Sequence, residues 1–193
     1  MPAAVRDPGL WLVRHAPVPG ADGLCYGASD WPADAAATQQ AAERLAASLP
    51  PQLPVYCSPL QRCRQLAQAL QQQRPDLPWR TDARLRELDF GAWEGRSWDE
   101  IGQAGLDVWL ADFAHRPPAP GAESVAQLMA RVGTAWRDGM AAHQPALWIT
   151  HAGVIQAARL LAGGVALPAS AADWPAAAVA HGEPLFLRVR TGG

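Results

Sequence analysis

The sequence predicts an α/β fold in which a mostly parallel central sheet is flanked by helices on both faces. Short apolar runs that are typical of buried strands alternate along the chain with longer segments that carry helical patterning. A chain of 193 residues can bury a full core, and the Pro-rich stretches at 50–54 and 117–120 are typical of loops rather than of domain linkers. We therefore expect a single domain.

The predicted strands are short. Residues 10–13 form an apolar run, and Pro17 and Pro19 prevent it from continuing as a helix, so a buried strand should end near His15. The remaining predicted strands are residues 55–57, residues 146–150 and residues 184–189.

Helices are predicted between these strands. Residues 34–49 are Ala-rich, and residues 154–161 are also expected to be helical. Ser58 and Pro59 should open a helix that runs to about Gln73, with Ser58 as its N-cap and Pro59 at the first helical position. The apolar stripe of this helix comprises Leu60, Cys63, Ala67 and Leu70.

Two further pairs have the spacing of a capping box, Ser97 with Glu100 and Ser124 with Gln127. The second pair opens a helix that should bury one face. The residues of that face are Val125, Leu128, Met129, Val132, Ala135 and Trp136.

The composition argues against several classes of partner. The formal net charge is −2 at pH 7, without the basic surplus expected of a nucleic-acid-binding protein. A membrane-spanning helix needs about 18 consecutive apolar residues, and no apolar run in the sequence approaches that length. We therefore expect a cytoplasmic protein without a membrane partner. The three cysteines are odd in number and lack CxxC spacing, which fits a reducing compartment and argues against a disulfide framework or a zinc site.

Residue types also exclude some chemistry. All 16 basic residues are Arg, as a GC-rich codon bias would produce, so a P-loop or a pyridoxal Schiff base is ruled out. No D-x-D, H-x-H or H-E-x-x-H pattern occurs, so neither a metal nor another cofactor is expected. A cysteine phosphatase needs an Arg six residues after its Cys, in the pattern C-x5-R. The residue at that distance from Cys57 is Cys63, so the sequence argues against a cysteine phosphatase.

Four polar residues should meet at one edge of the sheet. Arg14 and His15 end the first predicted strand, Arg62 lies in the first turn of the helix after the second, and His151 follows a later one. The carboxyl ends of parallel strands share an edge, where ligands bind in open α/β sheets. Guanidinium groups and helix N-termini both favour phosphate oxygens, so these residues predict a phosphate site. Taken singly, each could instead be a solvated Arg or a core His.

The motifs resemble those of the histidine phosphatase superfamily, also called phosphoglycerate mutase-like. The resemblance rests on five ordered segments, which are LVRHA at 12–16, CSPLQRCRQLA at 57–67, RELDFGAWEG at 86–95, PGAES at 120–124 and ITHAGVIQ at 149–156. It implies one histidine phosphatase domain over residues 1–193 with the fold of that superfamily.

The resemblance also implies roles for single residues. His15 would be the nucleophile that forms a phosphohistidine, and Glu87 the proton donor. Arg14, Arg62 and His151 would bind the phosphoryl oxygens of a small-molecule phosphate ester, without a metal.

The chain departs from the usual family pattern at four positions. The Gly, Thr, Asn and Ser that are common in the family are replaced, in that order, by Ala16, Val18, Ala21 and Cys57. The backbone or Ser29 could supply the auxiliary phosphate contacts that these changes remove.

Glu87 has a competing interpretation. A partly buried Glu beside Leu88 and Phe90 would keep its proton, as a general acid must, but a salt bridge to Arg84 or Arg86 would explain it equally well. In the second case the acid would have to be sought among the neighbouring carboxyl groups.

The segment DGLCYGASD, residues 22–30, resembles the G-x-C-Y-G-x-S/T-D stretch of the α-ribazole phosphatase branch, whose members act in cobalamin synthesis. Tyr26 or Trp31 could stack on the heteroaromatic base of such a substrate. The alternatives are a broad-specificity small-molecule phosphatase, a phosphoglycerate mutase-like enzyme, or a catalytically silent phosphate-binding module on the same fold. Retention of both His, both Arg and Glu87 argues against the silent module.

Overall fold

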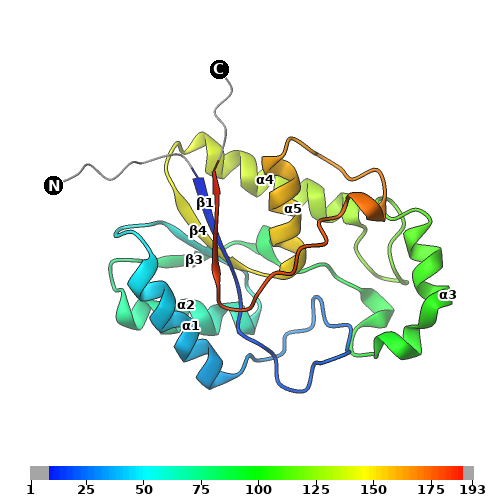
Figure 1. Cartoon of the computed structure of the whole chain (residues 1–193), viewed down its shortest axis with the longest axis horizontal. Helices are drawn as coiled ribbons and strands as arrows, with labels where there is room; N and C mark the ends of the chain where they lie inside the picture. The colour runs from blue at the N-terminus through cyan, green and yellow to red at the C-terminus, as the bar shows by residue number, and fades with distance from the viewer. Residues whose placement is uncertain (1–8, 189–193) are drawn as a thin grey trace.

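The computed structural model describes residues 9–188 and contains one five-stranded sheet (Figure 1). Its strand order is β3-β2-β4-β1-β5. The strands are β1 (Gly9–Arg14), β2 (Val55–Cys57), β3 (Trp79–Thr81), β4 (Ala146–Thr150) and β5 (Pro184–Arg188). The pairs β1–β4, β2–β4 and β2–β3 are parallel, and β5 runs antiparallel to β1. The prediction of a mostly parallel sheet is therefore confirmed.

Different helices cover the two faces of the sheet, because successive strand residues point to opposite faces. Leu12 packs with buried residues of α4 (Val125–Ala141) and α5 (Ala152–Ala162). The next residue, Val13, packs with α1 (Ala35–Ser48) and α2 (Gln61–Gln73). Helices on both faces are thus confirmed.

Three predicted strands coincide with β1, β2 and β4, and the fourth with β5 as far as Arg188. Val189, the last residue of the predicted strand, lies outside the described residues. The short strand β3 was not predicted, since its sequence, WRT, carries no apolar alternation.

Both capping boxes form as predicted, at Ser97 with Glu100 and at Ser124 with Gln127. All six residues of the predicted core face of α4 are buried. Across the described residues, every helix is too short or too polar to cross a membrane.

The predicted start of α2 is wrong. The helix begins at Gln61 after an N-cap residue, Leu60, that makes no side-chain capping bond. The backbone N–H of Ser58 instead donates to the carbonyl oxygen of Ile149 on β4 at 2.9 Å, which extends the sheet beyond β2. The hydroxyl of Ser58 is hydrogen-bonded to His151 at 2.7 Å. Ser58 therefore belongs to the edge of the sheet rather than to the helix.

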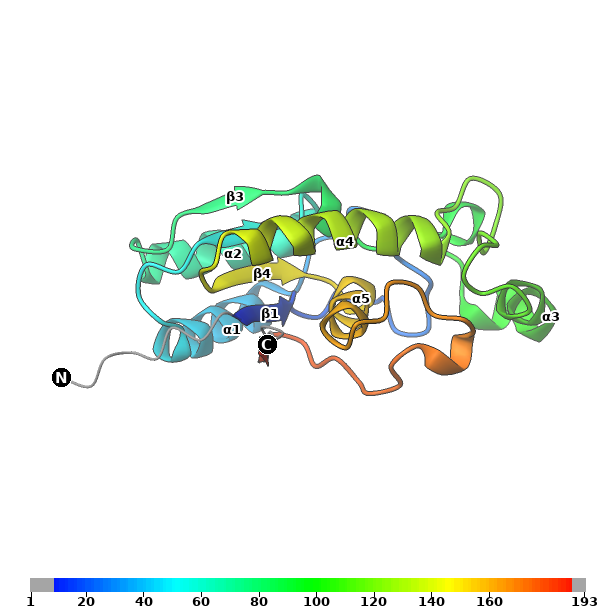
Figure 2. The same cartoon turned by 90° about the horizontal axis from the view of Figure 1, so that it is seen from above.

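Helix α3 (Trp98–Leu110) lies apart from the sheet, at the end of the molecule opposite α1 and α2 (Figures 1 and 2). None of its residues is fully buried, and Gly102 interrupts it with φ 70° and ψ 165°. Its indole rings at Trp98 and Trp109 pack edge-on against Phe90. Aromatic contacts therefore connect this helix to the segment that follows Glu87.

The capping box of α4 should contribute to stability. Ser124 Oγ accepts from the N–H of Gln127 at 3.2 Å, and Gln127 Oε1 accepts from the N–H of Ser124 at 2.8 Å. We expect Ser124→Ala to lower the free energy of unfolding by about 1 kcal/mol in urea denaturation. Ser48→Ala, in the exposed last turn of α1, should change it by less than about 0.5 kcal/mol. Equal effects of the two substitutions would contradict a capping role.

Candidate active site

The carboxyl ends of β1, β2 and β4 bring the predicted residues to one edge of the sheet. Arg14 is the last residue of β1, and His15 follows it. Arg62 is the second residue of α2, and His151 is the N-cap of α5. The imidazole rings of His15 and His151 have centroids 5.1 Å apart. These four residues therefore lie together.

The hydrogen bonds of His15 determine which of its nitrogens is protonated. Nδ1 lies 2.7 Å from the carbonyl oxygen of Ala16, which can only accept, so Nδ1 carries the proton. Nε2 is then unprotonated and accepts from Nε of Arg62 at 3.2 Å. The pKa of His15 is held well below its usual value, mainly by burial and secondly by the charge of Arg62. His15 thus presents a neutral, nucleophilic Nε2.

Arg62 is fully buried and aimed at this nitrogen. Its two terminal nitrogens donate to backbone carbonyl oxygens, NH1 to Ser29 at 2.5 Å and NH2 to Gly27 at 2.6 Å. The guanidinium carbon also lies 5.4 Å from the centroid of the Tyr26 ring. The loop at residues 27–29 therefore fixes the orientation of Arg62.

That loop is held from its other side by Glu94. Four backbone N–H groups and one hydroxyl donate to the Glu94 carboxylate over distances of 2.5 to 3.1 Å. The donors are the N–H groups of Gly27, Ala28, Ser29 and Phe90 and the hydroxyl of Ser29. The carboxylate of Glu94 thus binds the N–H groups of residues 27–29, whereas the guanidinium of Arg62 binds the carbonyl oxygens of residues 27 and 29.

Gly27 is required by this packing. A Cβ at residue 27 would lie 1.8 Å from the carbonyl oxygen of Leu88, which is backbone and cannot move aside easily. This role of Glu94 was not predicted from the sequence, because its partners in the loop are 65 to 67 residues away. The available signal was Gly27 in the DGLCYGASD segment, which marks a close approach of two backbone segments.

Arg14 supplies a second guanidinium group. Its NH1 donates to the carbonyl oxygen of Val179 at 3.0 Å. Its Nε is buried and has no hydrogen-bond partner among residues 9–188. A buried donor without an acceptor is costly, so an anion at this position would be stabilised.

Glu87 is held by backbone donors. Oε1 accepts from the N–H of Leu88 and Oε2 from the N–H of Gly153, both at 3.0 Å. A Cβ at Gly153 would lie 2.4 Å from Oε1, so a larger residue here would displace the carboxyl group of Glu87.

The alternative salt bridge of Glu87 is not formed. Within the described part of the chain, Arg84 pairs with Asp82 at 2.7 Å and with Asp138 at 2.5 Å. Neither Arg84 nor Arg86 forms an ion pair with Glu87 there.

His151 is fully buried, and burial is the main cause that holds its pKa well below the usual value. Its Nε2 is hydrogen-bonded to Ser58 Oγ at 2.7 Å and lies 3.5 Å from Cys63 Sγ. Like His15, it is therefore neutral near pH 7.

A third histidine reaches the site from far along the chain. Nδ1 of His181 donates to the carbonyl oxygen of His15 at 2.7 Å. The rings of His181 and His15 have centroids 5.3 Å apart, and burial lowers the pKa of His181. Sequence reasoning missed His181 because it lies in an Ala-rich segment without a helical or strand pattern.

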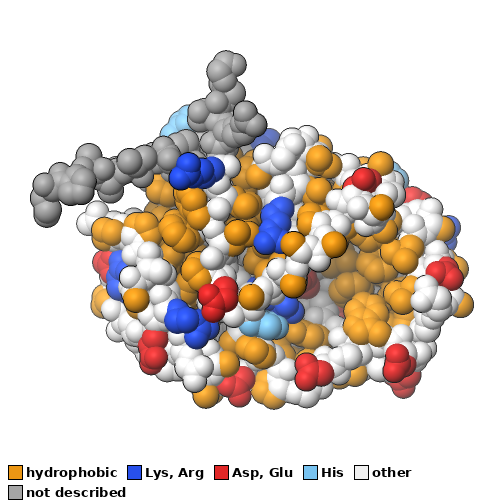
Figure 3. All heavy atoms as spheres, viewed as in Figure 1, with side chains coloured by type: hydrophobic (Ala, Val, Ile, Leu, Met, Phe, Trp, Pro, Cys, Tyr) orange, Lys and Arg blue, Asp and Glu red, His pale blue; other side chains and the backbone are white. Residues whose placement is uncertain are grey.

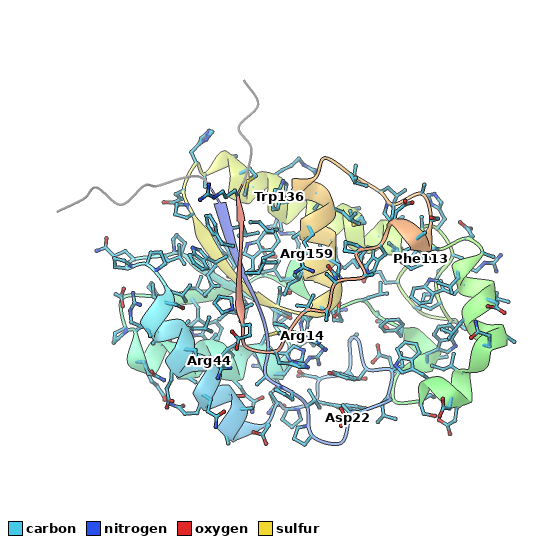
Figure 4. All side chains as sticks on the ribbon, in the orientation of Figure 1. Arg14, Asp22, Arg44, Phe113, Trp136 and Arg159 are labelled. Atoms are coloured by element: carbon cyan, nitrogen blue, oxygen red, sulfur yellow. The ribbon has the colours of Figure 1, made fainter. Side chains whose placement is uncertain are left out.

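Several of these groups line a cavity of about 340 Å³, whereas His151 lies outside its lining. Its polar lining comprises Arg14, His15, Arg62, Glu87, His181 and Asp22, and its aromatic lining comprises Tyr26, Phe90 and Trp98. Figure 3 shows this face of the molecule hollowed near its centre, with basic and histidine side chains on one side and hydrophobic side chains on the other. In the same orientation, Figure 4 places Arg14 near the centre and Phe113 toward α3.

Two predicted substrate contacts are engaged within the protein. Ser29 donates its hydroxyl to Glu94. Tyr26 lines the cavity, but its ring stacks on Trp31 with centroids 5.6 Å apart and an angle of 15° between the planes. In the described residues, no group of three or more His, Cys, Asp or Glu is placed to hold a metal ion.

The model of the histidine phosphatase superfamily (branch 1) matches residues 10–182, which include all of the site residues named above. The chain belongs to the histidine phosphatase superfamily. Members of this superfamily are phosphatases or mutases that act on phosphate esters. A comparison with the curated proteins finds no match.

Several solved structures are similar to this chain in fold. The protein TTHB049 from Thermus thermophilus is 29% identical, with a TM-score of 0.68 and 92% of each chain covered. A provisional alpha-ribazole-5'-P phosphatase from Escherichia coli is 28% identical, with a TM-score of 0.70 over 83% of this chain and 81% of that one. The mycobacterial glucosyl-3-phosphoglycerate phosphatase Rv2419c, at 24% identity, has a TM-score of 0.74 over 90% of this chain and 86% of that one.

In this member of the superfamily the site combines a neutral imidazole, two guanidinium groups and a carboxyl group around one cavity. An imidazole with a free lone pair can attack phosphorus, and guanidinium groups can stabilise the negative charge of the transferred phosphoryl group. A carboxyl group can exchange a proton with the ester oxygen.

Glu94 should control anion binding through Arg62. In Glu94→Gln the side-chain NH2 would face backbone N–H donors, so the loop at 27–29 would shift and carry Arg62 with it. Losing one hydrogen bond to a charged group costs about 1.5–3 kcal/mol, so we expect the inhibition constant of inorganic phosphate to rise roughly 10-fold or more. Phosphate inhibition kinetics measure this.

Glu100→Gln, at the exposed capping box of α3, is the matched control and should leave phosphate inhibition unchanged. If Glu94→Gln lowers the melting temperature but leaves phosphate inhibition unchanged, Glu94 stabilises the loop without positioning Arg62.

Proposed function

We propose that this protein is a phosphomonoesterase that works through a phosphohistidine on Nε2 of His15, and that it removes the 5′-phosphate of α-ribazole phosphate in the cytoplasm. The observation that carries the hydrolytic function is the neutral Nε2 of His15, which faces Arg62 in a cavity that also contains Glu87. Binding alone would need neither a nucleophile nor an acid, so this arrangement favours an enzyme over a silent phosphate-binding module.

In the first step Nε2 attacks the phosphorus atom. The N–P bond forms, the bond from phosphorus to the ester oxygen breaks, and Glu87 gives its proton to the departing alkoxide. Arg62 Nε, which donates to Nε2 in the structure, transfers its hydrogen bond to a phosphoryl oxygen, because the charged acceptor binds it more strongly. Arg14, which lines the same cavity, binds the same group. His151 is buried outside the cavity lining, with its ring centroid 5.1 Å from that of His15, so it acts on the nucleophile rather than on the phosphoryl oxygens.

In the second step water attacks the phosphohistidine. Glu87, now a carboxylate, takes a proton from the water as the O–P bond forms, and the N–P bond breaks. Phosphate leaves, and His15 and Glu87 return to their starting protonation states. The chemistry needs no metal, because guanidinium groups supply the positive charge.

The choice of substrate rests on the DGLCYGASD segment and on the Escherichia coli structure described above. Asp22, Gly23, Leu24 and Tyr26 of that segment line the catalytic cavity, which supports a role for the segment in substrate binding. A broad-specificity phosphatase is the second candidate, since the aromatic lining would accept several apolar alcohols. A screen of phosphate esters that includes α-ribazole phosphate, glycerol phosphate and 3-phosphoglycerate separates the two by kcat/KM.

The nucleophile can be tested directly. We expect His15→Ala to reduce kcat roughly 10³-fold or more and to abolish the acid-labile phosphoenzyme that rapid quenching with ³²P-labelled substrate traps. His115→Ala, at an exposed histidine away from the site, should keep both signals. Near-normal turnover in His15→Ala would overturn the mechanism, and a wild-type protein that binds phosphate esters without turnover would favour the silent module.

The role of Glu87 depends on the leaving group. General acid catalysis contributes about 10²–10⁴-fold, and Glu87→Gln cannot deliver the proton. With an alkyl phosphate, whose alkoxide leaves poorly, we expect Glu87→Gln to slow phosphoenzyme formation by about that factor. The loss with p-nitrophenyl phosphate should be much smaller, because its phenolate needs little protonation. Stopped-flow or quench kinetics of the first step measure the rate of phosphoenzyme formation from each of the two esters.

Asp89→Asn is the control for Glu87→Gln, because Asp89 accepts from the N–H of Gly91 nearby. Equal fractional losses on the two esters in Glu87→Gln would remove Glu87 from the catalytic residues.

A further inference from the structure

A second cavity adjoins the catalytic one and has a different chemical character. Its volume is about 250 Å³, and its walls include the aromatic side chains of Trp109, Phe113 and Trp174 together with Leu128. Pockets that take whole drug-sized ligands measure about 300–1,000 Å³, so this cavity suits one ring system rather than an entire substrate.

The two cavities meet at Glu87 and Phe90, which line both of them. Gly153, whose N–H binds Oε2 of Glu87 at 3.0 Å, also lines the apolar cavity. The carboxyl group proposed to protonate the ester oxygen therefore stands at the junction. The phosphoryl group must lie on the side of His15 and Arg62, so the alcohol part of the ester begins at this junction.

The walls favour an uncharged aromatic group. Glu87 is the only ionisable residue that lines the apolar cavity, and no Arg lines it within the described residues. An anionic leaving group would meet apolar walls and a carboxyl group, so it would lose hydration without gaining a partner. An aromatic ring would gain contact with three aromatic side chains, of which Phe113 and Trp174 are already edge-on at 5.7 Å.

Tyr26 is less suited to hold such a ring. Trp31 stacks against it, and the guanidinium group of Arg62 lies over it, so both compete with a ligand for the faces of the phenol ring.

We propose that the apolar cavity is the leaving-group subsite and that it binds an aromatic, uncharged ring of the alcohol while the phosphate occupies the catalytic cavity. This inference rests on the proposed phosphatase function. It assigns specificity to Trp109, Phe113 and Trp174, which come from α3, from the chain just after it and from the segment that precedes β5.

The test compares 1-naphthyl phosphate, glycerol 2-phosphate and 3-phosphoglycerate as substrates of the wild-type protein and of Trp174→Ala. Trp174 is only partly buried, so its removal should open the cavity while leaving the fold intact. In the wild type, kcat/KM should be highest for 1-naphthyl phosphate and lowest for 3-phosphoglycerate. Trp174→Ala should reduce the value for 1-naphthyl phosphate roughly 10-fold, mostly through KM, and change that for glycerol 2-phosphate less than about twofold.

Trp79→Ala is the matched control, because Trp79 is a partly buried tryptophan on β3, outside both cavities. It should alter no substrate preference. Equal losses on all three esters in Trp174→Ala, or no wild-type preference for the naphthyl ester, would overturn the subsite while leaving the phosphatase function standing.

A separate binding measurement keeps the two proposals distinguishable. Calorimetric titration of His15→Ala with 1-naphthyl phosphate does not require turnover, and Trp174→Ala introduced into this background should weaken binding roughly 10-fold. If the wild type hydrolyses none of the esters, the phosphatase proposal fails, and the titration still decides whether the cavity binds the ring. If Trp174→Ala leaves the affinity of His15→Ala for 1-naphthyl phosphate unchanged, the subsite is refuted.

Discussion

A fully buried guanidinium group must find hydrogen-bond acceptors inside the protein, because water cannot reach it. Arg62 finds three, which are the carbonyl oxygens of Gly27 and Ser29 and Nε2 of His15. One of the three is the reacting nitrogen itself, so satisfying the charge of Arg62 also orients the nucleophile. The position of α2, which carries Arg62, and the path of the loop at 27–29 are therefore coupled to the reacting nitrogen.

The negative charge that balances Arg62 lies on the far side of the same loop. The carbonyl oxygens of residues 27 and 29 face the guanidinium, whereas the N–H groups of residues 27–29 face the carboxylate of Glu94. Peptide groups held between opposite charges are polarised, and such networks strengthen each member. The protein thus separates a buried ion pair by one layer of backbone, so that the cation remains available to an anionic ligand.

Local patterns predicted the fold well where neighbouring residues determine the outcome. The two capping boxes need only contacts within a few residues, and the buried face of α4 follows from the helical spacing of its apolar residues, so these features were predicted correctly. The start of α2 was wrong because two distant groups, the carbonyl oxygen of Ile149 and the ring of His151, bind Ser58. Helix α3, with its kink at Gly102, is set by aromatic contacts across loops rather than by its own apolar pattern.

The same distinction applies to the site. Arg14, His15, Arg62 and His151 could be identified because each follows the end of a strand or begins a helix, and sequence alone locates those points. Glu94 and His181 act through backbone groups far away in the chain, and no spacing reveals such partners. The apolar cavity beside Glu87 likewise arises from tertiary packing of α3, α4 and the segment near Trp174.

Strand β5 couples the edge of the sheet to the completion of the site. Until β5 pairs with β1, β1 is the edge of the sheet and exposes unpaired backbone groups that can template association with other chains. His181, which binds the carbonyl oxygen of His15, precedes β5 by only a few residues and arrives with it. A chain in which β5 has not yet paired is both open at its sheet edge and incomplete around His15. Pairing of β5 with β1 therefore closes the edge and brings His181 to His15 in the same step.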